Sequence, residues 1–210
     1  MRITSGTARG LIIKMPSGPK IRPTLDITRK AIFDIIGENI TGARFLDLFA
    51  GTGANGIEAL SRGASFAVFV DKSMFCVKSI KENLIKTGLN KNSKVVKSDV
   101  LNFLKKSSIR NPGINSVINE RYDIVFADPP YDRNPEQKKY GREKNDFIET
   151  ESLAKITLQL LSKGDILNEN PLVIIEHSPE TEMPDSKGLL RIWRERQYGS
   201  TMVSIYQRGV

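Results

Sequence analysis

Apolar and polar positions alternate along this chain with two different periods, and together they predict a mixed α/β domain. Short apolar runs typical of buried strands lie at residues 44–49, 66–70, 94–97, 122–127 and 172–176. Between these runs, apolar residues recur at helical spacing near 54–62, 73–87, 99–106 and 146–163. Strands that alternate with helices need crossover connections, so we expect a mostly parallel sheet covered by helices.

The two ends of the chain depart from this alternation. Residues 2–5 and 10–15 predict a short hairpin, and helical spacing follows from about Leu25 to Ile36. Near the other end, 189–197 and 200–207 predict a terminal hairpin. We therefore expect a seven-stranded, mostly parallel sheet with an antiparallel terminal strand. A small N-terminal β-hairpin extension at residues 1–24 would precede a main domain at 25–210, and the polar stretches 107–119 and 131–145 would form loops.

Composition is that of a globular domain and excludes several other classes. The chain has 210 residues, of which 39% are hydrophobic and 27% charged, so it can bury a sizeable core. No apolar run approaches the roughly 18 residues that span a bilayer, and the first residues lack the apolar core of a signal peptide. The single cysteine, Cys76, cannot form an internal disulfide, so we expect a cytoplasmic location.

Positive charge is concentrated at the N-terminus. The whole chain carries +8, and residues 1–44 alone contribute eight basic and three acidic side chains, or +5. A concentrated basic surface attracts polyanions, which indicates contact with nucleic acid.

A glycine-rich turn follows the first predicted strand of the alternating region. Gly51, Gly53 and Gly56 match G-x-G-x-x-G between a strand and a helix, and Asp71 ends the next strand. The glycines let the backbone approach a ligand closely, and a carboxylate beyond them can accept hydrogen bonds from ribose hydroxyls. This pattern predicts a nucleoside site, for either a nicotinamide dinucleotide or S-adenosylmethionine.

Asp47 favours the second of these cofactors. It stands four residues before Gly51, at the carboxyl end of the first strand, where we expect it to face the ligand crevice. A pyrophosphate gains nothing from a carboxylate there, whereas the ammonium and sulfonium groups of S-adenosylmethionine are attracted to one.

The fourth strand ends in Asp128-Pro129-Pro130-Tyr131, which we take as the catalytic residues. The prolines fix the backbone and remove two N–H donors, which leaves a stiff loop with outward carbonyls. An exocyclic amino nitrogen on a base is a poor nucleophile, and a carboxylate and a proline carbonyl can orient it by accepting its N–H bonds. The ring of Tyr131 can stack on the base. The motif predicts direct methylation of a base amino group, with no metal and no covalent enzyme intermediate.

Together these motifs resemble the amino-methyltransferase superfamily. The resemblance extends to Arg2-Ile3, Gly6, Arg9-Gly10, Arg22-Pro23-Thr24, Arg29, Phe33 and the run from Asp47 to Gly53, which look like the RsmD-type bacterial 16S ribosomal RNA guanine-N2 methyltransferases. It implies a Rossmann-like class I methyltransferase fold and transfer to a guanine N2 amino group, guanine 966, in 16S ribosomal RNA or the assembling small subunit. A monomer is expected.

The resemblance also assigns the candidate site residues, among them Asp99, whose position in this fold contacts the adenine amino group and which can also cap the next helix. Cofactor contacts are expected from Asp47, Phe49, Ala50, Gly51, Gly53, Asp71, Lys72, Asp99, Val100 and Asp128. RNA contacts are expected from Arg2, Arg9, Arg22, Thr24 and Arg29, of which Arg29 could instead reach the cofactor carboxylate.

Two alternatives to the guanine activity stay open. The Asp-Pro-Pro-Tyr motif also suits adenine N6 methylation of DNA or another RNA, although DNA enzymes generally need an added recognition domain. The chain could also be a non-catalytic RNA-binding module, which a failure to bind S-adenosylhomocysteine would favour.

Three residues are predicted to have no part in the site. A lone histidine makes no metal centre, so His177 is expected at the surface or in a turn. Cys76 is expected to pack in the core, and Trp193, on a predicted strand, is expected to pack against the protein rather than to stack on a base.

Overall fold

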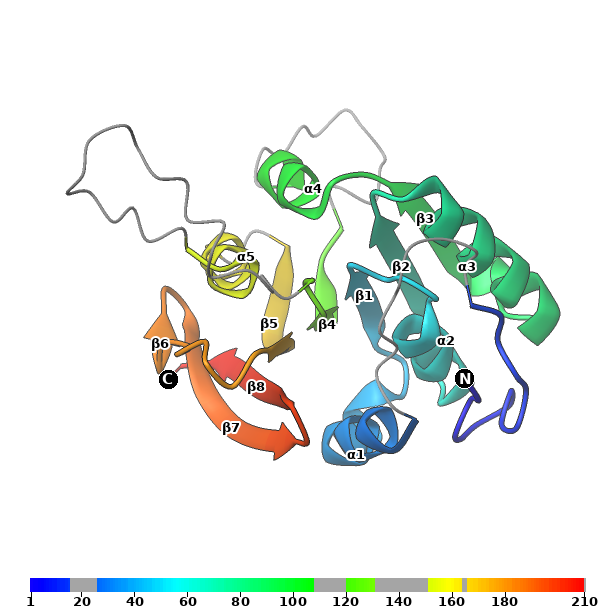
Figure 1. The fold of residues 1–210 in the computed structure, drawn as a ribbon, viewed down its shortest axis with the longest axis horizontal. Coiled ribbons are helices and arrows are strands. Elements are labelled where there is room, and N and C mark those ends of the chain that lie inside the picture. Colours follow the sequence, from blue (N-terminus) through cyan, green and yellow to red (C-terminus); the bar gives the residue numbers. More distant parts are fainter. Residues whose placement is uncertain (16–25, 108–119, 131–150, 164–165, 210) are drawn as a thin grey trace.

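One twisted sheet runs through the whole molecule (Figure 1). The computed structural model describes residues 1–15, 26–107, 120–130, 151–163 and 166–209. Its strands lie in the order β3-β2-β1-β4-β5-β8-β7-β6. Their bounds are β1 Arg44–Leu48, β2 Phe66–Asp71, β3 Ser93–Lys97, β4 Tyr122–Ala127, β5 Leu167–His177, β6 Ser186–Lys187, β7 Leu190–Tyr198 and β8 Thr201–Arg208. Strands β1 to β5 pair in parallel, while β8 joins β5 antiparallel.

This topology confirms the predicted Rossmann-like α/β class, with a difference of one strand. The sheet of the described residues has eight strands where seven were expected. The additional strand, β6, has only two residues, and it pairs with the first two residues of β7. An element this short has no hydrophobic period, so the sequence pattern could not reveal it.

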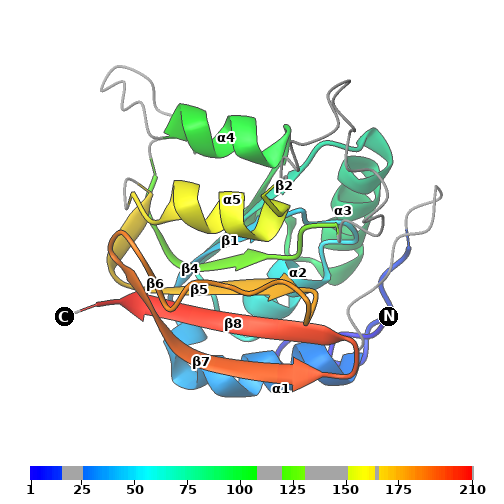
Figure 2. The same cartoon turned by 60° about the vertical axis from the view of Figure 1, so that its left-hand side comes forward.

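Helices cover both faces of the sheet (Figure 2). On one face, apolar residues of α1 Asp26–Ile36, α2 Ala54–Ser61 and α3 Met74–Thr87 form a core with alternate residues of the strands. On the other face, α4 Val100–Ser107 and α5 Leu153–Leu161 do the same. The short 3₁₀ helices η1 Gly37–Ile40 and η2 Asn90–Asn92 precede β1 and β3. None of the described helices is long and apolar enough to cross a membrane.

Helix ends follow local backbone chemistry, and this corrects one predicted boundary. α1 ends at Ile36 before Gly37, as expected, and α3 ends at Thr87 before Gly88, which has a left-handed φ of 72°. The helix predicted at 146–163 instead begins at Leu153 within the described residues, because the Ser152 hydroxyl accepts from the N–H of Lys155 and caps it.

Residues 1–15, which we call the N-terminal strap, fold back on themselves at the expected place. Their backbone forms hairpin-like hydrogen bonds, from Ile3 N–H to the Leu11 carbonyl and from Ile13 N–H to the Met1 carbonyl. Only one residue pair, Arg2 and Ile12, forms an antiparallel bridge, so the strap contains no extended strand of the predicted kind. Ile3, Ala8 and Ile13 are buried in the same core as α1 and α2.

Candidate functional site

Three carboxylates gather at the carboxyl edge of the sheet. β1 lies between β2 and β4 and runs parallel to both, so the ends of the three strands lie side by side. Asp47 lies near the end of β1, Asp71 ends β2, and Asp128 directly follows β4. The chain order reverses between β1 and β4, and ligands of open α/β sheets bind at such a switch point.

The glycine loop between β1 and α2 adopts the backbone conformation that its sequence requires. Phe49, Gly51 and Gly53 have φ angles of 58°, 53° and 78°, in the region that favours glycine. At Gly56 the constraint is space, since a Cβ atom there would lie 2.2 Å from the ring of Phe69 in β2. The glycines thus allow α2 to begin directly against the sheet, beside the three carboxylates.

Asp47 supports this loop from below. Its side chain is 1% exposed, and its Oδ2 accepts a hydrogen bond of 2.9 Å from the N–H of Gly56. We had expected this carboxylate to face the ligand crevice. It lies beneath the loop instead. Burial raises the pKa of Asp47 well above its usual value, and the neighbouring charges of Asp128 and Asp71 raise it further. A cation bound here would relieve this repulsion.

Asp71 also holds the glycine loop. The sequence had led us to expect only that its carboxylate would accept hydrogen bonds from ribose hydroxyls. One carboxylate oxygen accepts from Gly51 N–H at 2.9 Å, and the other accepts from Ser73 N–H at 2.8 Å. Lys72, which follows it, is exposed. Each oxygen retains a second acceptor site for a ligand hydroxyl.

The ends of β3 and β4 complete this edge. Asp99 is exposed and caps α4, because its Oδ1 accepts from Asn102 N–H at 3.1 Å, while Val100 is buried. Asp128 is half-buried, Pro129 is buried and Pro130 is exposed. Tyr131 lies outside the described residues, as do Arg22 and Thr24.

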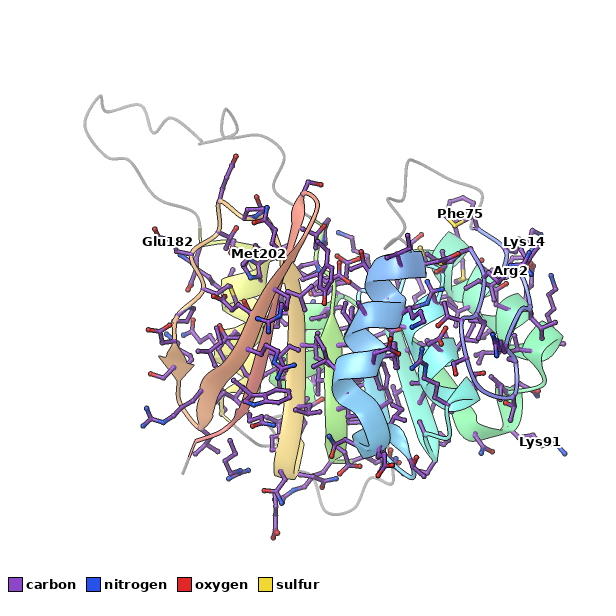
Figure 3. The ribbon with its side chains drawn as sticks, turned by 90° about the horizontal axis from the view of Figure 1, so that it is seen from below. Arg2, Lys14, Phe75, Lys91, Glu182 and Met202 are labelled. Atoms are coloured by element: carbon purple, nitrogen blue, oxygen red, sulfur yellow. The ribbon has the colours of Figure 1, made fainter. Side chains whose placement is uncertain are left out.

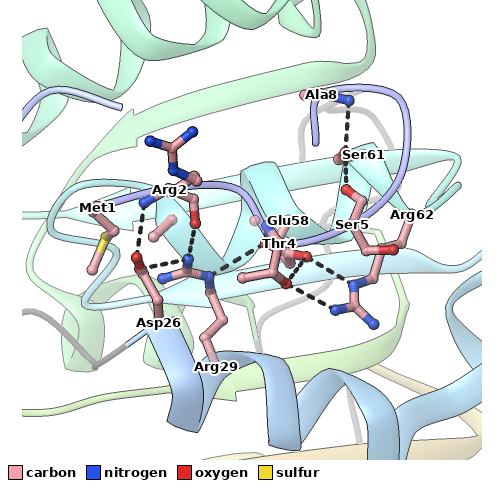
Figure 4. Close-up of polar contacts among 12 residues, drawn as sticks. Met1, Arg2, Thr4, Ser5, Ala8, Asp26, Arg29, Glu58, Ser61 and Arg62 are labelled. Carbon is pink, nitrogen blue, oxygen red and sulfur yellow. Dashed lines mark hydrogen bonds and ion pairs between the residues drawn. The ribbon is translucent and has the colours of Figure 1, made fainter. Parts of the chain in front are cut away.

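The predicted RNA-contact arginines occupy different environments. Arg2 and Arg9 are exposed on the N-terminal strap. Arg29 is 0% exposed, and its guanidinium binds Glu58, Asp26 and the carbonyl of Arg2 (Figure 4). In this arrangement Arg29 joins α1 to the strap and to α2, and it presents no surface to RNA. The sequence shows that residue 29 is an arginine, but it does not show whether that side chain forms an internal ion pair or contacts RNA at the surface.

Asn83 of α3 is a supporting residue that the sequence gave no reason to select. Its Nδ2 donates to the carbonyl of Thr52 in the glycine loop and to the carbonyl of Lys14, each at 3.0 Å. Its Oδ1 accepts from Lys14 N–H at 2.8 Å. One buried amide thus connects the strap to the loop, and a single asparagine on a helix carries no pattern that reveals this.

The residues set aside above differ in outcome. Cys76 is buried, as predicted. His177 is only 3% exposed, which corrects the surface assignment; its Nε2 lies 2.7 Å from Ser204 Oγ on the neighbouring strand. Trp193 is 43% exposed, and the guanidinium of Arg194 lies over its ring. Among the described residues, no group of three metal-ligating side chains comes together.

This combination of topology and site defines a protein class. A sheet in the order β3-β2-β1-β4-β5, antiparallel strands after it, a glycine loop and acids at the strand ends are those of a class I S-adenosylmethionine-dependent methyltransferase. Within that class, the chain belongs to the family described as "Conserved hypothetical protein 95", which matches residues 1–207.

Named relatives and a solved structure agree with this assignment. The chain is 35% identical to "Putative rRNA methyltransferase YlbH" of Bacillus subtilis, over 99% of each chain. It is 30% identical to "Ribosomal RNA small subunit methyltransferase D" of Escherichia coli, over 99% of this chain and 90% of the relative. The solved structure of "Putative methyltransferase yhhF from Escherichia coli" superposes with a TM-score of 0.77 at 29% identity, over 99% and 97% of the chains.

Proposed function

We propose that this protein methylates the N2 amino group of a guanine in small-subunit ribosomal RNA. The observation that carries the proposal is the position of Asp128 and Pro129, next to the carboxylates of Asp47 and Asp71 at the switch point of the sheet. An amine that accepts the methyl group, held by Asp128 and Pro129, would meet a cationic methyl donor held beside Asp47 and Asp71.

The described residues fit S-adenosylmethionine. When bound, this cofactor supplies a methyl group on a positively charged sulfur. The carboxylates of Asp71 and Asp128 lie close enough to the buried Asp47 to raise its pKa, and three acids at one edge of the sheet favour a cation. The backbone of Phe49 to Gly53 forms the surface on which the cofactor would lie, and Asp71 would accept from its ribose hydroxyls.

Residues of this chain would act mainly by positioning the base. The Asp128 carboxylate and the Pro129 carbonyl would each accept one N–H of the exocyclic amine, which directs the nitrogen lone pair toward the methyl group. Pro129 is buried, so its backbone is held in place by its surroundings. Tyr131 is proposed to stack on the base.

The choice of RNA rests on the relatives and on the basic strap. Two relatives that match nearly the whole chain are named as ribosomal RNA methyltransferases, one of them of the small subunit. Arg2 and Arg9 are exposed and can bind phosphates. Guanine N2, position 966, the monomeric state and a cytoplasmic location come from family resemblance or composition and remain predictions.

Replacing Asp128 tests the catalytic proposal. Asp128→Ala should lower the rate of methyl transfer to small-subunit ribosomal RNA by about 100-fold or more, because a positioned acceptor is lost. S-adenosylhomocysteine binding, measured by calorimetry, should persist. Asp185→Ala, which removes an exposed acid near β6, is the matched control and should transfer at the original rate. Full activity of Asp128→Ala would contradict the proposal.

The strap is best tested by substitution rather than deletion. Removing residues 1–15 would uncover the core that Ile3, Ala8 and Ile13 help to form, so any loss of RNA binding could reflect unfolding. Arg2→Gln with Arg9→Gln should instead weaken RNA binding and its salt dependence while sparing cofactor affinity. Unchanged RNA affinity would remove the strap from the RNA surface.

A further inference from the structure

The C-terminal hairpin presents a row of arginines that the motifs of the catalytic site do not include. Arg191, Arg194 and Arg196 lie on β7, and the pairing with β8 determines where they point. Arg191 lies opposite Gln207, Arg194 opposite Ile205, and Arg196 opposite Val203. Residues directly opposite one another in an antiparallel pair point to the same face. The three partners alternate along β8, so all three arginines share one face of the sheet.

A β-bulge produces this alignment. The register shifts between Ile192 and Arg194, with Trp193 as the inserted residue. In a regular strand, residues 191 and 194 would point to opposite faces, because side chains alternate with a period of two. The bulge brings Arg194 and Arg196 onto the face of Arg191. Bulges often re-aim side chains near functional sites.

This arginine face lies on the same side of the sheet as α1. Val203 and Ile205, opposite Arg196 and Arg194, belong to the core cluster that contains Ile32 and Phe33 of α1. In the view from below, α1 lies between the C-terminal hairpin, where Met202 is labelled, and the end of the molecule where Lys91 is labelled (Figure 3).

The face is exposed and its charge is not neutralised by an ion pair. Arg191 and Arg196 are exposed, and none of the three arginines forms a salt bridge with another described residue. Arg194 is held over the ring of Trp193, with its guanidinium carbon 4.7 Å from the ring centroid. Across the sheet, Arg196 is in line with Val203 of β8 and then with the acid Glu176 of β5. Glu176 is two strands away from Arg196 and is buried.

The row also leads toward the candidate site. β8 is antiparallel to β5, and Met202 pairs with His177 at the carboxyl end of β5. The β7–β8 turn therefore lies at the edge of the sheet that carries Asp47, Asp71 and Asp128. The β8 partners of Arg191 and Arg196, Gln207 and Val203, are four residues apart, so the row covers about 13 Å at about 3.3 Å per residue. A chain of phosphates bound along β7 would thus run toward this edge.

We propose that the face of β7 formed by Arg191, Arg194 and Arg196 binds the sugar–phosphate backbone of the RNA substrate. It acts as a second RNA contact, separate from the N-terminal strap at the other end of the sheet. Arg194, fixed by Trp193, is the most preorganised of the three. This inference rests on the proposed RNA methyltransferase function and adds to it the part of the surface that guides the substrate.

The test replaces all three arginines and measures binding to a transcript of small-subunit ribosomal RNA as salt is varied. Each single-strand phosphate contact contributes about 0.7 to the slope of log affinity against log salt, so three contacts contribute about 2. The Arg191→Gln/Arg194→Gln/Arg196→Gln variant should show a slope shallower by this amount. Between 50 and 200 mM salt, its affinity should therefore fall about 20-fold less than that of the original protein.

A matched control removes three positive charges at the far edge of the sheet. Lys81, Lys91 and Lys94 are exposed on α3, η2 and β3, and Figure 3 shows Lys91 at the end of the molecule away from Met202 of the hairpin. Their replacement by Gln should leave the slope within about 0.5 of the original. Calorimetric binding of S-adenosylhomocysteine checks that both variants are folded, and each single arginine substitution should lower the slope by about 0.7.

The possible outcomes separate this inference from the proposed function. If the arginine variants keep the original slope while the protein still methylates the RNA, the β7 face is not an RNA contact and the enzyme assignment stands. Equal losses in the arginine and lysine variants would indicate a non-specific effect of net charge and would also overturn the inference. If the unaltered protein neither binds nor methylates the transcript, both proposals fail.

Discussion

Hydrogen bonds and ion pairs join the N-terminal strap to α1 and α2 (Figure 4). Among the acids that make these contacts, the buried carboxylate of Glu58 should contribute most to stability. Its two oxygens accept from Thr4 N–H at 2.8 Å, the Thr4 hydroxyl at 2.6 Å and Arg62 Nε at 2.8 Å. Arg29 Nε lies 3.4 Å away, and the side chains of both Arg29 and Glu58 are 0% exposed. Glu58→Ala would leave a buried guanidinium with one fewer anionic partner.

The size of the effect follows from this geometry. Removing one partner of a buried ion pair costs about 3–5 kcal/mol, and the lower end applies because Asp26 still binds Arg29 at 2.9 Å. We expect Glu58→Ala to lower the free energy of unfolding by about 3 kcal/mol. For a domain of this size the midpoint of thermal unfolding would then fall by about 6–12 °C.

The assay is urea unfolding followed by circular dichroism, with Asp34→Ala as the control. Asp34 is half exposed and pairs with Lys30 and Arg62, so its loss should cost less than about 1 kcal/mol. Hydrogen exchange should also show faster exchange of the strap amides in Glu58→Ala. Equal destabilisation by the two substitutions would refute the claim that the buried network anchors the strap.

Three further predictions concern the glycine loop. Gly56→Ala places a Cβ 2.2 Å from Phe69, so it should cost about 1–3 kcal/mol in urea unfolding and weaken cofactor binding; original stability would contradict the packing argument. Asn83→Ala leaves the Thr52 carbonyl without its donor, and it should raise the KM for S-adenosylmethionine more than it lowers kcat, while an unchanged KM would make Asn83 purely structural. The raised pKa of Asp47 predicts that S-adenosylmethionine affinity, measured by calorimetry, weakens as pH falls, since protonation removes the charge that favours a cation. Asp47→Asn should flatten this dependence, and an equally steep profile in that variant would assign it to another group.

The raised pKa of Asp47 also predicts how the stability of the folded protein changes with pH. A carboxyl whose pKa is raised in the folded protein keeps its proton at pH values where the unfolded chain has lost it. Its contribution to stability is therefore greatest below the ordinary pKa and is lost as pH rises through the raised value. Cofactor binding would recover part of that loss by favouring the ionised form.

Much of the fold was predictable because it depends on local periods. The alternation of apolar strands and amphipathic helices defined β1 to β5 and the helices between them, and the glycine loop was identified with both of its flanking elements. The features that were missed have no such period. Two-residue β6 is too short, and the bulge at Trp193 depends on pairing with β8, which is not visible in β7 alone.

The site was predictable in its position but less so in its contacts. Asp47, Asp71 and Asp128 were selected because they end strands, and the topology brings those ends together. Residue type does not reveal which way a side chain turns, however. Asp47 turned beneath the loop, and Arg29 became buried because Glu58, distant in sequence, supplies its counter-ion. Both outcomes depend on tertiary contacts that no sequence spacing encodes.

Nucleoside analysis after methyl transfer tests the central claim most directly. The protein is incubated with methyl-labelled S-adenosylmethionine and small-subunit ribosomal RNA that lacks the modification, and the digested RNA is analysed by mass spectrometry. Our account predicts label in N2-methylguanosine, and labelling at a rate lower by about 100-fold or more when Asp128→Ala is used. Label in an adenine, or undiminished label with Asp128→Ala, would contradict it.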